Sequence, residues 1–150
     1  MRKKPLLYGC GSLAVLALAG FAFLGWAMFG DQEVYVSGAP RHKLAPSSAT
    51  QIDYYERQNI SGLVSVTYLV GEEEFRKFAG ERGWVLERRK AVEGNHRAWS
   101  PQDWAEEPMS EARPRIEECL FYEVRQANGG GITVIYDLAS SRAIINKSSR

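Results

Sequence analysis

The side chains that could catalyse a reaction are few and far apart along the chain. A cysteine and a histidine that meet in space form a nucleophile pair, and the candidates for such a pair are Cys119 and His96. Two acidic doublets, Glu106-Glu107 and Glu117-Glu118, offer the carboxylates that a glycosidase needs as acid and nucleophile. A cysteine in a strand is usually packed in a core, and acidic doublets are usually solvated. We therefore predict no catalytic residue and expect that the protein is not an enzyme.

The sequence also lacks the spacing of a metal or phosphate site. No His/Cys/Asp/Glu cluster has the spacing of metal ligands. Gly129-Gly130-Gly131 lacks the Lys-Ser/Thr of a phosphate-binding loop and precedes a strand, which indicates a hairpin. His42 stands between Arg41 and Lys43 in a region that we interpret as a linker, so we expect its side chain to be solvated. We predict no metal and no cofactor.

The residues most suggestive of binding lie in one long loop between ordered elements. Tryptophan and arginine are enriched at binding hot spots, and binding residues concentrate on loops over a rigid scaffold. The alternative is that the tryptophans cover an open face of the sheet, and we favour it. The candidate interaction surface consists of Trp99, Trp104, Arg97 and Arg113.

An uncharged apolar run precedes these elements. It extends from Leu6 to Phe29 and as a helix would be about 36 Å long. A bilayer has a hydrocarbon core of about 30 Å, so residues 6–29 predict a transmembrane helix after a cytoplasmic end at 1–5. The residues that we expect at the membrane interface are Arg2, Lys3, Lys4, Tyr8 and Trp26.

The basic residues before the run predict its orientation. Lysine and arginine favour the cytoplasmic side, so the N-terminus should be cytoplasmic and the C-terminal domain extracytoplasmic, as in a single-pass bacterial envelope protein with a signal anchor. The alternative is a signal peptide cleaved near Ala19, which would release the protein. With 19 Lys and Arg against 18 Asp and Glu, the chain lacks the charge of a nucleic-acid binder.

The remaining chain predicts a linker over 30–51 and an α+β domain over 52–150. In the strand 63–70, alternate valines and Tyr68 should be buried, while Ser65 and Thr67 should face a partly wet side. Three glutamates at 72–74 favour a helix start, and Gly83 favours its end. Residues 84–88 can return as another strand.

The C-terminal part predicts a β-meander. Its strands are expected at 119–126, 132–136 and 142–146, and Cys119 should be buried in the first of them. The predicted domain is therefore a small antiparallel sheet of four or five strands with one packed helix and a C-terminal β-meander.

These elements favour a non-enzymatic interaction or accessory domain. The anchor would bring it to the lipid bilayer, and the long loop or a sheet edge would meet another envelope protein. The alternatives are a small-ligand or lipid-binding domain with a pocket between helix and sheet, and a hydrolase whose pocket gathers His96, Cys119 or the acidic doublets. The sequence leaves the oligomeric state open.

Overall fold

The computed structural model describes residues 15, 18–21, 25, 32–58, 62–90, 101–102 and 116–149. The chain divides into two compact units, Met1–Asp31 and Gln32–Arg150. In the first unit the described residues are helical, and most of the predicted span 6–29 lies outside them. Among the described residues of the whole chain, no helix has the length and apolar character needed to cross a membrane.

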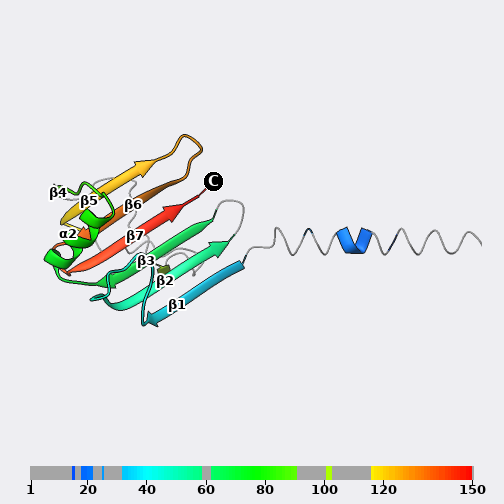
Figure 1. The fold of residues 1–150 in the computed structure, drawn as a ribbon, viewed down its shortest axis with the longest axis horizontal. Coiled ribbons are helices and arrows are strands. Elements are labelled where there is room, and N and C mark those ends of the chain that lie inside the picture. Colours follow the sequence, from blue (N-terminus) through cyan, green and yellow to red (C-terminus); the bar gives the residue numbers. More distant parts are fainter. Residues whose placement is uncertain are drawn as a thin grey trace, which may run out of the picture. The chain divides into compact units, whose positions relative to one another are not determined.

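The second unit is built on one antiparallel sheet, to which the described residues contribute seven strands (Figure 1). Their order in the sheet is β1-β2-β3-β7-β6-β5-β4, so β1 and β4 form its two edges. The strands are β1 (Gln32–Ala39), β2 (Thr50–Gln58), β3 (Leu63–Leu69), β4 (Glu87–Lys90), β5 (Glu118–Arg125), β6 (Gly131–Asp137) and β7 (Arg142–Ser148).

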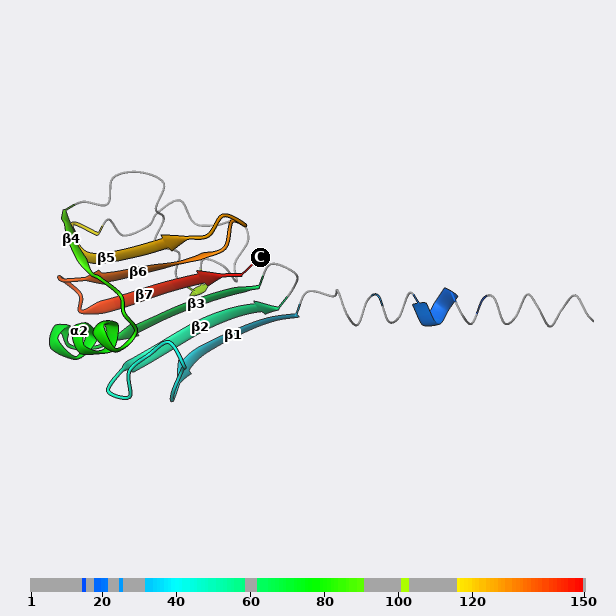
Figure 2. The same cartoon turned by 45° about the horizontal axis from the view of Figure 1, so that its top comes forward.

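Helix α2 (Glu72–Glu81) packs on one side of this sheet, which we call the helix face (Figure 2). The glutamates at 72–74 lie in its first turn, as predicted, where their negative charges interact favourably with the positive end of the helix dipole. Phe75 is buried and stacks on Tyr136, with ring centroids 4.6 Å apart. Just beyond the helix, Gly83 has φ +71, a left-handed conformation that glycine adopts readily. The predicted helix and its end are confirmed.

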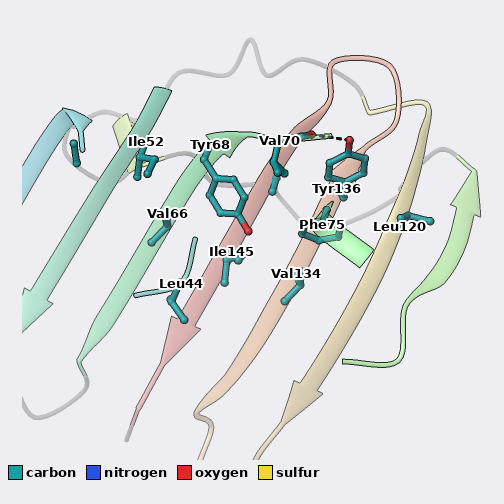
Figure 3. Packing of buried hydrophobic residues seen from close by; sticks show 12 residues of the cluster. Leu44, Ile52, Val66, Tyr68, Val70, Phe75, Leu120, Val134, Tyr136 and Ile145 are labelled. Carbon is teal, nitrogen blue, oxygen red and sulfur yellow. Dashed lines mark hydrogen bonds between the residues drawn. The ribbon is translucent and has the colours of Figure 1, made fainter. Parts of the chain in front are cut away.

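The main core lies between the sheet and the layer that covers the helix face (Figure 3). Val66 and Tyr68 of β3 alternate into it, as predicted, and Val134 and Ile145 join them from β6 and β7. The Tyr136 hydroxyl donates a hydrogen bond to the Val70 carbonyl oxygen at 2.9 Å. This core therefore contains at least one polar group with a hydrogen-bond partner.

The opposite side, the far face, differs from the prediction. Ser65 and Thr67 were expected to be partly wet, but they are 0% and 4% exposed. The Thr67 hydroxyl donates to the Ala143 carbonyl oxygen at 3.0 Å, which satisfies its hydrogen-bonding need inside the protein. A second buried cluster, Cys119, Phe121, Ile135 and Ile144, occupies the same face. Both faces of the sheet are therefore buried at its centre.

The region predicted as a linker contributes to the sheet and its covering layer. Within residues 30–51, Gln32–Ala39 form β1 and pair with β2, so the sheet begins well before Ile52. The connection between the two strands also packs on the domain, because Leu44 is 6% exposed and belongs to the main core. Proline and small residues suggested a linker, whereas contacts with residues distant in the sequence hold this segment in place.

The C-terminal meander is confirmed, since β5 pairs with β6 and β6 with β7, all antiparallel. The strand expected at 84–88 begins later, at Glu87. Trp84 lies before the strand, and its ring stacks on Tyr122 with ring centroids 6.2 Å apart. With β1, β2 and β4 included, the fold is α+β and richer in strands than the sequence suggested.

Candidate functional site

The predicted interaction surface falls where the structure gives no description. Trp99, Trp104, Arg97 and Arg113 all lie outside the described residues, and they remain a prediction. The predicted membrane-interface residues Arg2, Lys3, Lys4, Tyr8 and Trp26 lie outside them as well.

The strongest candidate in the described part is the outer edge of β1. This strand pairs with β2 on one side, and no described strand pairs with its other side. Val34 is 48% exposed on the helix face and Tyr35 is 43% exposed on the far face. Only one of its eight residues is charged, namely Glu33. We call residues 32–37 the open edge.

The other edge of the sheet has the opposite character. β4 has four residues, all of them charged and exposed. Arg88 donates to Glu118 at 2.8 Å, and the Arg89 guanidinium lies 3.9 Å from the centroid of the Phe121 ring. Short edges covered with charge discourage pairing with other strands, whereas longer apolar edges invite it. The open edge lacks this protection.

A β-bulge sets the end of the open edge. The register of β1 with β2 shifts between Val36 and Ala39, and Gly38 has φ +67. One carboxylate oxygen of Asp53 accepts hydrogen bonds from the Ser37 hydroxyl at 2.7 Å and from the Gly38 backbone N–H at 2.8 Å. This arrangement gives the Ser37 hydroxyl and the Gly38 N–H an acceptor at the point where the regular strand stops.

His42 lies directly after β1, and the expectation that it is solvated was wrong. Its side chain is 6% exposed, and its ring packs against Tyr54 with centroids 4.9 Å apart. The Leu44 backbone N–H donates to Nδ1 at 3.1 Å, so Nδ1 carries no proton and Nε2–H donates to Glu56 at 3.2 Å. Both ring nitrogens are therefore used to hold the loop, and neither is free to act as a base.

The charges around His42 agree with this neutral tautomer. Burial lowers the pKa of His42 and outweighs the opposing effect of the Glu56 carboxylate. Burial raises the pKa of Glu56, but the interactions with His42 and Lys43, chiefly hydrogen bonds, together have the larger opposite effect, so the pKa is lowered overall. Neutral histidine beside an ionised carboxylate is thus the stable state near neutral pH. The backbone carbonyl of Lys43 also accepts a hydrogen bond from Arg82, which ties the loop to the end of α2.

Two open hollows lie near the end of the sheet where β3 begins. One of about 330 Å³ is lined on the helix face by Lys43, Glu56 and Lys147 among others. The other, of about 240 Å³, is lined by Glu123 and Thr133 among others. Neither lies between α2 and the sheet, where the ligand-binding alternative expected a pocket. There the Phe75 ring stacks on Tyr136, and the Trp84 ring contacts both Phe78 and Tyr122.

The described residues give no support to a hydrolase. Cys119 is 0% exposed, as predicted, and burial raises the pKa of its thiol, which disfavours the reactive thiolate. Glu118 pairs with Arg88 at the sheet edge, while His96 and the doublet Glu106-Glu107 lie outside the described residues. Within the described residues, no group of three His, Cys, Asp or Glu side chains is placed to hold a metal ion.

The open edge was missed because its sequence signal is short. Val34-Tyr35-Val36 is rich in β-formers, but it follows the predicted span directly and precedes a segment rich in proline and small residues. The alternation of residues in β1 is also hidden, because an edge strand buries little on either face. Compared with known proteins, the chain matches no family model, no curated protein and no solved structure.

Proposed function

We propose that this chain is a membrane-anchored, non-enzymatic interaction domain that pairs its open edge with an extended strand of a protein partner. The observation that carries the proposal is the exposure of Val34 and Tyr35 on the open edge, a six-residue stretch with which no described strand pairs on its outer side. In such binding, main-chain hydrogen bonds supply affinity and alternate side chains supply specificity.

The open edge offers both kinds of contact. Its free side has backbone N–H and C=O groups for which no described strand provides partners. Val34 and Tyr35 point to opposite faces, so an added strand gains one apolar neighbour on each side. The contrast with β4 supports a specific role, because one edge of the same sheet is protected and the other is not.

The apolar run Leu6–Phe29 supports the membrane part of the proposal. Only Gly30 and Asp31 separate it from β1 along the chain. With Arg2, Lys3 and Lys4 before the run, the domain would be outside the cytoplasm, where it meets partners at the same membrane.

The experiment is site-specific photocrosslinking of the full chain in intact membranes. A photoreactive amino acid at Val34 should give one discrete adduct, and the crosslinked peptide of the partner, identified by mass spectrometry, should map to one extended segment. The matched control is Val85, which is 78% exposed and lies outside the strands. Tyr35→Lys should abolish the adduct at Val34, since a charge at this edge opposes strand pairing.

Equal yields at Val34 and Val85, or an adduct that survives Tyr35→Lys, would overturn the edge-binding proposal. A reporter fused after Arg150 tests the topology, and activity only in the cytoplasm would overturn the orientation. Sequencing of the mature N-terminus distinguishes an uncleaved anchor from cleavage near Ala19.

A further inference from the structure

We infer that the strand which pairs with the open edge is β1 of a second copy of this chain, antiparallel about a two-fold axis at Tyr35. The inference rests on the proposed function and names its partner. Antiparallel pairing of identical strands places residues at equal distances from the axis opposite each other. With the axis at Tyr35, Val34 lies opposite Val36 of the second copy, and Glu33 lies opposite Ser37.

This register is favoured over its neighbours by charge and by the bulge. An axis at Glu33 would put two carboxylates directly opposite each other, which is unfavourable. An axis at Val34 would put the charged side chain of Glu33 opposite the aromatic ring of Tyr35. An axis at Val36 would put Gly38, which has a left-handed φ of +67, opposite Val34 in the ladder. The axis at Tyr35 avoids all three faults.

The side chains on both faces complement themselves in this register. On the far face, Tyr35 lies opposite Tyr55 within one copy, so the pairing extends a row of tyrosines across the axis. On the helix face, exposed Val34 gains contact with half-buried Val36, which already packs against the main core. Aromatic and β-branched cross-strand pairs are among those that stabilise sheets. A partner strand must therefore be apolar at its centre, a condition that β1 itself meets.

The size of the interface explains why anchoring matters. In this register only residues 33–37 of each copy pair, and so short a ladder buries much less than the roughly 1,600 Å² of a standard stable complex. Two copies anchored in one bilayer meet at a raised effective concentration, which lets a weak contact become populated. The pairing should accordingly be strong in membranes and weak for the chain in dilute detergent.

Disulfide crosslinking of the full-length chain in membranes tests the register. The background carries Cys10→Ser and keeps Cys119, which is buried. Under a mild oxidant, Tyr35→Cys should form a covalent dimer at least tenfold faster than Val34→Cys, Val36→Cys or the control Val85→Cys. The reason is that only position 35 lies opposite itself, with Cβ atoms about 5 Å apart, whereas 34 and 36 are offset diagonally from their own copies by about 7–8 Å.

A mixture of Val34→Cys and Val36→Cys chains is the second measurement, because it keeps Tyr35 in place. It should crosslink about as fast as Tyr35→Cys, and each chain alone should not. Equal rates at all four positions would indicate random collision and overturn the inference. A photoadduct at Val34 to a different protein, without a disulfide at 35 or in the mixture, would overturn the self-pairing but leave the proposed function standing. Absence of both signals would overturn both.

Discussion

Two tyrosines of the main core differ in one respect that a pair of mutations can measure. The Tyr136 hydroxyl donates to the Val70 carbonyl oxygen at 2.9 Å. The Tyr68 hydroxyl is buried in the same core and has no hydrogen-bond partner among the described residues (Figure 3). Burial also raises the pKa of Tyr68, so its hydroxyl stays protonated and uncharged. Removing the oxygen should therefore have opposite effects at the two positions.

The magnitudes follow from the cost of burying a polar group. A buried hydroxyl without a hydrogen-bond partner costs about 1–3 kcal/mol, so Tyr68→Phe should raise the free energy of unfolding by about 1 kcal/mol. Tyr136→Phe loses a hydrogen bond and deprives the Val70 carbonyl of this partner, so it should lower that free energy by about 1–2 kcal/mol. Each substitution removes one oxygen from a side chain that is 0% or 1% exposed, so the packing changes are matched.

Urea unfolding of the full chain followed by tryptophan fluorescence measures both effects. The two variants should differ by about 2–3 kcal/mol, with Tyr68→Phe the more stable. If Tyr68→Phe instead loses 1 kcal/mol or more, its hydroxyl has a partner and the account of this core is wrong. Equal losses in both variants would mean that packing, and not hydrogen bonding, decides the result.

Three further predictions concern the loop that holds His42, the β5–β6 hairpin and the far face. Because the pKa of His42 is lower in the folded chain, protonation of His42 favours the unfolded chain. The free energy of unfolding should therefore fall as the pH drops below about 6.5. In His42→Gln, the free energy of unfolding should depend less on pH in this range. Gly131→Ala should destabilise by about 1–3 kcal/mol in urea, because its Cβ would collide with the Val124 carbonyl oxygen, whereas Gly80→Ala in open space on α2 should stabilise by about 0.5–1 kcal/mol. Cys119 should react with a thiol reagent no faster than the chain unfolds, as followed by mass spectrometry.

Each of these predictions has a result that contradicts it. A pH slope that persists in His42→Gln would assign it to other groups. A neutral Gly131→Ala would show that the β5–β6 hairpin relaxes around the new methyl group. Labelling of Cys119 that outpaces unfolding would show that the far face opens locally.

Local signals predicted the elements that are decided locally. The glutamates at 72–74 and the glycine at 83 bracket α2, and the glycines at 129–131 indicated the first hairpin of the meander. In these segments the capping, charge and hairpin preferences of neighbouring residues all favour the observed structure.

The predictions failed where contacts between distant residues decide. Residues 40–49 resemble a linker in composition, yet Leu44 enters the core and His42 is held by Glu56. The polar side chains of Ser65 and Thr67 suggested a solvated face, but the same face carries the buried apolar residues of β5, β6 and β7. A hydroxyl that bonds to a backbone carbonyl, as in Thr67, is easily buried, and sequence alone does not show the carbonyl.

The candidate site illustrates the same limit, since an edge is a property of the sheet and not of any one strand. Val34 and Tyr35 are candidate binding residues only because the strand order places β1 at one edge of the sheet. The other edge, β4, consists of charged residues. An unguarded apolar edge tends to pair indiscriminately, so it persists in a protein when a partner occupies it or when its length is restricted. The bulge at Gly38 and the Asp53 carboxylate restrict it to six residues here, which is long enough for one ordered ladder and too short for strong binding in dilute solution. An edge of this kind suits a contact that depends on confinement to a membrane.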